Sequence, residues 1–449
     1  MTKQEGRDAT PEIIEPVYRI HERPKTWYEA LLYGWQHTLV DISPFVLPLA
    51  VAIAMGMSDA EKARFINFGL FAMGVATLIQ TTLGNRLPII QGPSATLTGT
   101  VAPIAAQMGA PAMWGGIFIG GLIEMIIGAG RLLTFFRRLF PPVVSGVVIM
   151  SIGFSLGLVA VRLMMGDGSG KHLLFASAVI LLIFFLNVRL QQPLRGILSR
   201  GAVFWAIWIV GVGVAGALGE VNWSLVAEKP WFQWPSLFPY GGPGFGWEFA
   251  LPAVLAILAG YFGSMVESLG DYAATCAVSA ETYRVEHINR GIFAEGLGSV
   301  VAAALGGLPC TSYTQNIGII ATTRVASRFV VQIAAVILML YGLCPKFGAL
   351  LVAMPRAVLG GVFVVVCGMI ILSGMRLAAP AGNRPAEAFL IGTTLIAALG
   401  IPIYANYVLG QAWLQSLPLT ARLFITNPVV LAVFLAVGLH LFFSCFTRK

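Results

Sequence analysis

The chain has 449 residues, of which only 11% are charged and 57% are hydrophobic. A soluble domain carries about a quarter charged residues, so this composition excludes a protein that covers its whole surface for water and predicts the lipid bilayer as its solvent. The formal net charge of +8 does not indicate a nucleic-acid-binding protein, because the Lys and Arg residues lie in short gaps between apolar runs and form no basic stripe with interleaved aromatic residues.

The N-terminal residues 1–32 are mostly polar and mixed in charge, without a cleavable signal peptide, so we expect them to form a cytoplasmic tail. Fourteen apolar runs follow, and each predicts a transmembrane segment. The predicted segments are 33–57, 66–84, 87–108, 112–131, 140–162, 172–190, 201–220, 249–269, 290–306, 308–323, 326–344, 347–374, 385–402 and 424–445. The fold class that we predict is therefore an all-α polytopic membrane protein.

Two of these runs, 87–108 and 308–323, are poor transmembrane helices. Each begins with a Leu-Pro pair, contains several Ser or Thr residues and has only a short apolar tail. We predict that spans 3 and 10 are interrupted, each with a short strand followed by a half-helix. Their unpaired backbone N–H groups would cost several kcal/mol each in lipid, so they must face a polar cavity.

The distribution of basic residues predicts the orientation in the membrane. With the N-terminus placed in the cytoplasm, 20 of the 28 Lys and Arg residues fall in the tails and inner gaps, and the outer gaps hold the other 8. Positive residues are enriched on the cytoplasmic side. Fourteen spans with both termini in the cytoplasm satisfy that rule.

A weak self-similarity predicts two halves. Residues 141–153 resemble 355–368 at an offset of 214, and 87–95 align with 308–316 at an offset of 221 through the Leu-Pro pair. Seven spans in each half make the repeat inverted, and inverted repeats with paired interrupted helices are typical of transporters. The second alignment makes Ser94 and Gln315 equivalent. Two helix N-termini would then face each other and favour a polar, electron-rich ligand.

No metal site or disulfide is predicted. The five histidines have no metal-binding spacing, and the cysteines lie in or beside apolar runs without CxxC spacing. We expect Cys276, Cys310, Cys344, Cys367 and Cys445 to be reduced. No cofactor is expected.

Four stretches resemble the nucleobase–ascorbate transporter family, also called nucleobase–cation symporter-2. The stretch QNIGIIATTR at 315–324 matches every specified position of the family signature Q/E/P-N-x-G-x-x-x-x-T-R/K/G. YGWQHTLV at 33–40 is similar to the first span of the family, RLPIIQGPSA at 86–95 to the third, and VESLGDYAA at 266–274 to the eighth. The resemblance covers essentially the whole chain.

This resemblance implies a core domain of spans 1–4 and 8–11 that moves like an elevator against a gate domain of spans 5–7 and 12–14, in a homodimer in the bacterial inner membrane. In bacteria such proteins are typically proton symporters for uracil, xanthine, uric acid or other purines. The implied domains are the N-terminal tail at 1–32, core at 33–131, gate at 132–220, a periplasmic loop at 221–248, core at 249–344, gate at 345–445 and a C-terminal tail at 446–449.

Glu267 is the strongest candidate for a substrate ligand. It lies in an apolar run, where a bare charge costs about 2.5–3.5 kcal/mol, and a carboxylate accepts the N–H groups of a xanthine-like ring. The resemblance implies that it is the principal ligand. Gln315 donates and accepts at once, which fits a carbonyl next to a ring N–H, and it can also cap its half-helix. The family associates Gln at this position with xanthine or uric acid, and Glu with uracil.

The candidates for proton coupling are the other polar residues of these stretches. Burial disfavours the charged form of a carboxylate, so Glu295 and Glu267 are the leading candidates. Asp271 lies one turn after Glu267 and is either part of the site or a charge at the cytoplasmic end of the span. His37 could shuttle protons, but a hydrogen bond that stabilises Glu267 or neighbouring spans is the favoured role. Gln36, beside it in the sequence, is expected to contribute to selectivity or gating.

The remaining residues of the signature have expected roles in structure or gating. Asn316 could touch the ligand, but a bracing role for the half-helix is favoured. Gly318 would allow a close helix approach. Thr323 and Arg324, about two turns beyond Gln315, would tune selectivity or gating.

One position departs from the family pattern, and another has no known role in the family. Ala95 stands where the family often has Phe after the serine of the third span, so the Ser94–Ala95 turn would contact the ligand through backbone N–H groups, and a stacking face worth about 1 kcal/mol is lost. Glu124 lies in the middle of a span with no known family role, and we expect a structural contact there.

The sequence leaves three alternatives to a purine symporter. The first is a carrier for uracil or another nucleobase. The second is an anion or sulfate exchanger of the same fold, although Glu267 would repel an anion. The third is a membrane enzyme, but the chain has no DDxxD cluster or nucleophile constellation, so we expect no enzymatic activity.

Overall fold

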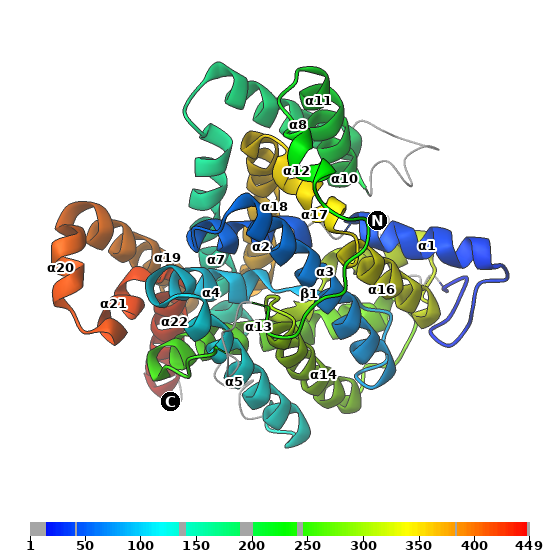
Figure 1. Cartoon of the computed structure of the whole chain (residues 1–449). Coiled ribbons are helices and arrows are strands. Elements are labelled where there is room, and N and C mark those ends of the chain that lie inside the picture. The colour runs from blue at the N-terminus through cyan, green and yellow to red at the C-terminus, as the bar shows by residue number, and fades with distance from the viewer. Residues whose placement is uncertain are drawn as a thin grey trace, which may run out of the picture.

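The structure is a computed structural model that describes residues 15–40, 43–133, 141–188, 201–239, 246–381 and 384–446. The described residues form helices around a central pair of three-residue strands, β1 (Gln91–Pro93) and β2 (Cys310–Ser312) (Figure 1). Several positions used in the sequence analysis lie outside these ranges. They are the charged residues of 1–14, most of those in the gaps around 131–138 and 189–200, and Arg448 and Lys449; the side chain of Cys445 is not described either.

The first half of the chain supplies α1 (Trp27–Val40), α2 (Ser43–Ala54), α3 (Asp59–Thr82), α4 (Ala95–Met108), α5 (Ala110–Ala129), α7 (Pro142–Met165), α8 (Gly170–Val188), α10 (Ala202–Ala206), the π-helix η1 (Ile207–Val214) and α11 (Ala215–Ala217). The second half supplies α12 (Trp223–Ala227), α13 (Leu251–Val278), α14 (Val285–Ala304), α15 (Thr314–Thr323), α16 (Arg328–Gly342), α17 (Pro345–Ala353), α18 (Arg356–Ala378), η2 (Ala379–Ala381), α19 (Pro385–Tyr404), η3 (Ala405–Leu409), α20 (Gly410–Ser416), α21 (Leu419–Thr426) and α22 (Pro428–Phe446).

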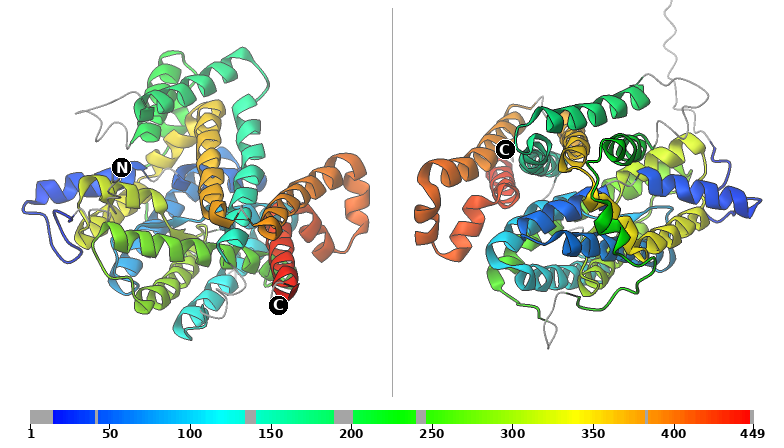
Figure 2. Two further views of the ribbon diagram at one scale, coloured as in Figure 1. Left: turned by 180° about the vertical axis from the view of Figure 1, so that it is seen from behind. Right: turned by 45° about the horizontal axis from the view of Figure 1, so that its top comes forward.

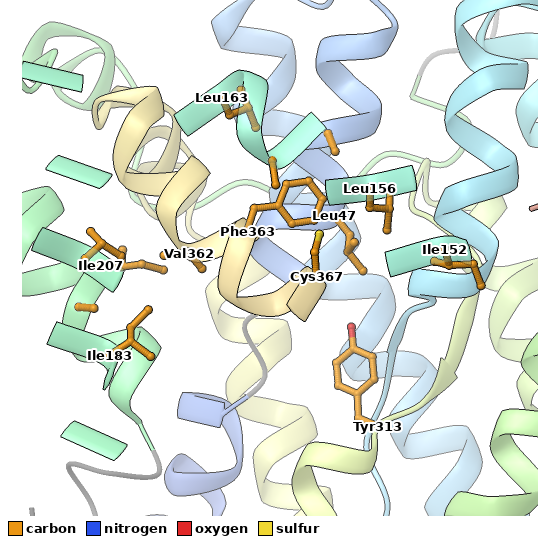
Figure 3. Packing of buried hydrophobic residues seen from close by; sticks show 14 of the residues in the cluster. Leu47, Ile152, Leu156, Leu163, Ile183, Ile207, Tyr313, Val362, Phe363 and Cys367 are labelled. Carbon is orange, nitrogen blue, oxygen red and sulfur yellow. The ribbon is translucent and has the colours of Figure 1, made fainter. Parts of the chain in front are cut away.

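The helices group around the strands in the same way in all views. Helices α19 to α22 lie on one side of the molecule, and α1 with α16 lies on the opposite side (Figure 2). One large hydrophobic cluster joins α18 to its neighbours, with Phe363 and Cys367 beside Leu47 of α2 and Leu156 of α7 (Figure 3). Ile90 and Tyr313, which directly flank β1 and β2, belong to the same cluster.

Two antiparallel helix pairs pack through glycines. A Cβ atom on Gly146 of α7 would lie 2.7 Å from the carbonyl oxygen of Gly374 in α18, and one on Gly296 of α14 would lie 2.6 Å from the carbonyl oxygen of Gly121 in α5. Small residues let membrane helices approach to backbone contact. The α7–α18 pair also bears out the offset of 214 in the sequence, because α7 follows Pro141 and α18 follows Pro355.

Several predicted spans are broken in the structure. The prediction that residues 347–374 form one helix is wrong. The run divides into α17 and α18 at Met354 and Pro355, because the proline ring disfavours a helical residue before it and removes an N–H donor. The run 424–445 includes the end of α21, and the chain bends by 85° at Asn427 before α22. The run 33–57 contains α1 and α2, and residues 41–42 between them lie outside the described ranges.

In the described residues, seven helices are long and apolar enough to cross a membrane, and nine segments qualify if each bent helix pair counts as one span. The protein is therefore a multi-pass membrane protein. The fourteen-span inverted repeat stays a prediction, because the interrupted segments and the broken helices are too short to qualify by length.

Backbone contacts link the predicted loops on each side. The segments 222–239 and 246–248 hydrogen-bond to Ala353, Leu343, Ala304 and Pro111. All of these except Ala353, which lies inside a predicted span, are at or beside span ends predicted to be periplasmic. The N-terminal segment pairs instead with the residues after α15: Val17 N–H donates to Arg324 O at 2.7 Å, and Ala326 N–H donates to Tyr18 O at 2.8 Å. Part of the predicted free tail is therefore ordered against the end of a half-helix.

Candidate functional site

The two interrupted segments meet in a symmetric strand pair. Strands β1 and β2 are antiparallel, with Gly92 opposite Thr311 at the centre of the pairing. Two equivalent backbone hydrogen bonds extend the pairing just outside the strands: Ser94 N–H donates to Pro309 O at 2.9 Å, and Tyr313 N–H donates to Ile90 O at 3.0 Å. The prediction of a strand followed by a half-helix in both segments is confirmed.

Hydroxyl groups satisfy the outer edges of this strand pair. Thr77 of α3 accepts from Gln91 N–H at 3.0 Å, and Ser299 of α14 accepts from Cys310 N–H at 3.0 Å. An open strand edge is not tolerated in lipid. These two hydroxyls close the edges, and they explain how so short a sheet persists inside a membrane protein.

The strand pairing corrects the predicted equivalence of Ser94 and Gln315. Strand β2 begins 219 residues after β1, and α15 begins 219 residues after α4, so Ser94 corresponds to Tyr313 and Gln315 corresponds to Thr96. The offset of 221 is wrong because the Leu-Pro pairs that anchored the alignment precede the strands by different lengths: Pro309 directly precedes β2, whereas two residues separate Pro88 from β1.

Glu267 of α13 lies beside the start of α4. It is half-buried, and Thr96 Oγ1 donates a hydrogen bond of 2.8 Å to its Oε2 atom. Among the described residues, no donor reaches the Oε1 atom of Glu267. The carboxylate is therefore positioned by one hydroxyl and keeps an oxygen with which it can accept from a ligand.

Glu295 of α14 is fully buried and is surrounded by donors. Ser268 Oγ donates to its Oε2 atom at 2.8 Å, and Tyr272 Oη at 2.8 Å, Gln91 Nε2 at 3.3 Å and Ser312 Oγ donate to its Oε1 atom. Four donors match the acceptor sites that the two oxygens of a carboxyl group offer. Because these donors come from α13, β1 and β2, Glu295 ties the strand pair to the helices behind it.

A chain of hydroxyl groups in mutual contact runs from Ser94 to Ser268. Ser264 Oγ lies 3.4 Å from Ser94 Oγ and donates to Thr311 Oγ1 at 2.9 Å, and Thr311 lies 3.1 Å from Ser268 Oγ. Ser94 also caps α4, since its hydroxyl accepts from Leu97 N–H at 3.1 Å. Its side chain is fully buried, so its contribution to a ligand would come through the helix terminus that it caps. Ala95 follows it as the first residue of α4.

Asp271 does not lie at an exposed end of its span. It is 5% exposed, and its Oδ1 atom accepts from Thr314 Oγ1 at 2.7 Å. Its Oδ2 atom is buried without a partner in the described part of the chain. The side chain thus holds the first residue of α15 against α13, and its burial contradicts the alternative of a charge at the cytoplasmic end of the span. Its role at the site stays a prediction.

His37 and Asn316 form one contact between α1 and α15. Asn316 Nδ2 donates to His37 Nδ1 at 3.0 Å, and both side chains are buried. The favoured predictions for these residues, a bracing amide and a histidine that stabilises neighbouring spans, agree with this geometry. Gln36 is 7% exposed, and its Oε1 atom has no partner among the described residues.

Gln315 and Gly318 share an exposed face of α15. Both are exposed, and they lie three residues apart. The expected role of Gly318 in close helix packing is wrong, because a Cβ atom added there would meet nothing within 4 Å. The face that carries Gln315 therefore borders open space rather than another helix.

The end of α15 explains the last signature positions. Arg324 caps the helix in the left-handed region at φ 59°, where Gly is the most favourable residue, so a signature that accepts Gly there fits this turn. Thr323 donates through Oγ1 to Ile319 O at 2.7 Å. Both residues lie at the far end of α15 from Gln315.

Glu124 of α5 is a buried carboxyl group. It is 1% exposed, and both of its carboxylate oxygens lack a hydrogen-bond partner among the described residues. The structural contact expected for Glu124 therefore stays a prediction, and within the described residues it does not take the form of a hydrogen bond.

Sequence reasoning missed Thr96, Ser264, Ser268, Tyr272 and Ser312. For Thr96 the signal was present, since a correct repeat offset places it opposite Gln315. For the others the signal is weak, because Ser and Tyr are common in membrane helices. Only the folded arrangement brings Ser268, Tyr272 and Ser312 to Glu295, and Ser264 to Thr311. In the described ranges, no group of three or more His, Cys, Asp and Glu residues could hold a metal ion, and Cys276, Cys310, Cys344 and Cys367 are free.

The arrangement places the acceptor oxygens of Glu267 beside the start of one half-helix, where backbone N–H groups are potential donors. The model of the Permease family, Xan_ur_permease, matches residues 28–406. The chain belongs to this family.

Curated relatives of this Permease family member align along nearly the whole chain. It is 32% identical to the uric acid permease PucK of Bacillus subtilis over 432 residues, covering 93% of this chain and 96% of the relative. It is 29% identical to the nucleobase transporter PlUacP of Paenibacillus larvae, with coverage of 94% and 96%. The xanthine permease XanQ of Escherichia coli is also 29% identical, over 86% of each chain.

Solved structures share the fold of this family member at low sequence identity. The transmembrane domain of the cyanobacterial bicarbonate transporter BicA aligns with a TM-score of 0.59 at 16% identity, covering 94% of this chain and 99% of that one. The murine anion transporter Slc26a9 in its inward-facing state aligns with a TM-score of 0.67 at 12% identity, covering 96% and 70%. These likenesses concern the fold alone.

Proposed function

We propose that this permease is a proton-coupled symporter for an oxidised purine such as xanthine or uric acid, and that it works in the bacterial inner membrane with both termini in the cytoplasm. The observation that carries the proposal concerns Glu267, a half-buried carboxylate of α13 that lies beside the start of α4. Thr96 donates to one of its oxygens, and the other can accept from a ligand. The relatives named uric acid and xanthine permeases support the substrate class.

The chemistry of the base fits this site. A xanthine-like ring has N–H groups next to carbonyl oxygens; the N–H groups would donate to Glu267, and an amide such as Gln315 would both accept and donate. Gln315 is the second residue of α15, as Thr96 is the second residue of α4. The two half-helices would therefore present equivalent positions to opposite sides of one flat ligand.

An anion exchanger is the rival that shares this fold. Its substrate would have to approach Glu267, Asp271 and Glu295, which lie together on α13 and α14 around the strand pair. Like charges in a low-dielectric site repel strongly. The carboxylates favour a neutral or proton-accompanied substrate, and we propose a nucleobase rather than sulfate or bicarbonate.

We further propose that the helices around the strand pair move as an elevator against a gate that includes α7 and α18, within a homodimer. Each strand is hydrogen-bonded to the other and to α3 or α14, so the ligand-binding elements would move as one body. The proton gradient would drive uptake. We propose proton rather than sodium coupling because buried carboxyl groups provide titratable groups around the strand pair.

The test is uptake of radiolabelled xanthine by cells that express the permease, with a panel of unlabelled bases as competitors and a protonophore. We expect xanthine or uric acid to compete best, uracil and sulfate to compete poorly, and the protonophore to abolish accumulation. Uracil that competed better than xanthine would overturn the substrate, sulfate competition would favour the exchanger, and indifference to the protonophore would overturn proton coupling.

Glu267→Gln is the matched variant, because it keeps the size of the side chain and removes the charge. We expect it to lose most xanthine uptake while it reaches the membrane in normal amounts. Glu286→Gln is the control, since Glu286 lies at the exposed start of α14 in an ion pair with Arg290. Unchanged uptake in Glu267→Gln would contradict the proposed site.

A further inference from the structure

Glu124 is a titratable group that the proposed binding site does not use. It is 1% exposed in the middle of α5, and neither carboxylate oxygen has a hydrogen-bond partner among the described residues. An unsatisfied buried polar group costs about 1–3 kcal/mol, and more when it is charged. An apolar side chain would be more favourable for folding, so the carboxyl group calls for a functional explanation.

The position of Glu124 places it behind the site at a tight helix crossing. Gly121, one turn before Glu124, lies against Gly296, the residue after Glu295: a Cβ atom on Gly296 would lie 2.6 Å from both Gly121 O and Met125 N. Backbone contact at this crossing places Glu124, one turn after Gly121, and Glu295, directly before Gly296, on facing turns of the two helices, where charge on both carboxyl groups is unfavourable. In the described part of the chain, Tyr261 and Tyr272 of α13 and Cys310 of β2 are further titratable groups near Glu124.

The two carboxyl groups have opposite surroundings. Glu295 receives four hydrogen bonds, whereas Glu124 receives none among the described residues, so a negative charge is harder to hold on Glu124 than on Glu295. Two neighbouring carboxyl groups cannot both ionise without strong repulsion, so their surroundings decide which of the two keeps its proton. The pair therefore binds protons as a unit.

We propose that Glu124 and Glu295 form a coupled proton-binding pair across the α5–α14 crossing, in which Glu124 carries the coupling proton and Glu295 senses the ligand site. The proposal rests on the proposed symport function and names its ion site. Two of the donors to Glu295 lie at the ligand site: Ser268 follows Glu267 in α13, and Ser312 is the last residue of β2, two before α15. A ligand that moves either hydroxyl changes the charge stabilisation of Glu295 and thereby the proton affinity of Glu124.

The proton step involves only the O–H bond of the Glu124 carboxyl group. Loading forms this bond with a proton from the outer aqueous phase, and release to the cytoplasm leaves a carboxylate that Glu295 repels. The repulsion makes the empty, doubly ionised pair unfavourable. Reloading with a proton is consequently required before the next cycle, which is the condition for strict coupling.

The test compares wild type, Glu124→Gln and the surface control Glu286→Gln in proteoliposomes. Two assays are needed: exchange of labelled for unlabelled xanthine at equal pH, and accumulation driven by an imposed pH gradient. We expect Glu124→Gln to exchange at nearly the wild-type rate and to lose gradient-driven accumulation by roughly tenfold or more, while Glu286→Gln performs both. Wild-type accumulation by Glu124→Gln would overturn the proposal.

Glu124→Asp is the control for a folding defect, because it keeps the carboxyl group on a shorter side chain. We expect it to retain gradient-driven accumulation in part. Loss of both exchange and accumulation in the Gln and Asp variants alike would mean that Glu124 is structural, and this would also overturn the proposal.

A readout without substrate separates this inference from the proposed function. The infrared spectrum of the purified protein is expected to show a carbonyl stretch from a protonated buried carboxyl group that is lost in Glu124→Gln and retained in Glu286→Gln and Glu295→Gln. Loss of that band in Glu295→Gln alone would assign the proton to Glu295 and refute the pair. A wild-type protein that moved no xanthine but showed the Glu124 band would refute only the proposed substrate.

Discussion

Thr96 Oγ1 lies 2.8 Å from Glu267 Oε2, so the second residue of one half-helix holds the carboxylate of a helix 171 residues later in the chain. Thr96 is 2% exposed, and Glu267 is half-buried. The hydroxyl fixes one oxygen of the carboxylate and leaves the other for a ligand. Thr96 is thus a positioning residue of the candidate site.

Thr96→Val tests this role, since valine keeps the shape of the side chain and removes the donor. A hydrogen bond to a charged group is worth about 1.5–3 kcal/mol, and we expect the KM for xanthine to rise by roughly tenfold with little change in protein amount. The measurement is the concentration dependence of initial uptake. Thr96→Ser keeps the hydroxyl and should behave like wild type; an unchanged KM in the valine variant would remove Thr96 from the site.

Gln315→Glu tests the amide on the opposite half-helix. A carboxylate at the second position of α15 is favourable near a helix N-terminus, so folding should be preserved, but the donor to a ligand carbonyl is lost. We expect competition by xanthine and uric acid to weaken by about tenfold relative to uracil, a difference of about 1.4 kcal/mol. Gly318→Ala is the control on the same exposed face. Selectivity that did not move would argue against direct contact between Gln315 and the base.

Tyr272→Phe tests the donor set around Glu295. The change removes one hydroxyl that donates to Glu295 at 2.8 Å and accepts from Gln80 Nε2 at 3.0 Å, and it keeps the buried ring. Leaving buried polar groups without partners costs about 1–3 kcal/mol, so the midpoint of thermal unfolding in detergent should fall. Tyr283→Phe is the comparison, because Tyr283 is 38% exposed. Equal unfolding midpoints for both variants would contradict the importance of the donor set.

Gly296→Ala tests the crossing of α5 and α14. The added methyl group would lie 2.6 Å from two backbone atoms that cannot rotate away, and overpacking of this kind costs about 1–3 kcal/mol. We expect less folded protein by fluorescence-detected size-exclusion chromatography. Gly157→Ala in α7 meets nothing within 4 Å and should leave the elution profile unchanged. A normal profile for Gly296→Ala would mean that the two helices can separate at this point.

Much of the architecture follows from the pattern of the chain. Leu-Pro starts and Ser and Thr content identified both interrupted segments, because a membrane helix with these residues cannot satisfy its own backbone. The offset of 214 found α7 and α18 correctly. The offset of 221 failed by two residues, since a dipeptide in the preceding loop is free to shift along the chain while the strand register is not.

The site was predicted in part for a similar reason. Glu267, Glu295 and Asp271 stand out as carboxyl groups in apolar runs, and the structure brings them around the same strand pair. Hydroxyls carry no comparable signal, so Thr96 and Ser312 became visible only through their distances to these carboxylates. Glu124 was visible in the sequence, but only the structure reveals that both of its oxygens lack partners in the described chain.

The hydrogen bonds between β1 and β2 have a consequence for biogenesis. Strand β1 leaves the ribosome 219 residues before β2. Its backbone groups that face β2 therefore have no hydrogen-bonding partner until the second strand has been inserted. Thr77 can occupy one edge early, but the inner edge must wait in water or against the insertion machinery. A polypeptide truncated before Cys310 therefore retains an unsatisfied segment within the bilayer, which makes it a natural target for membrane proteases.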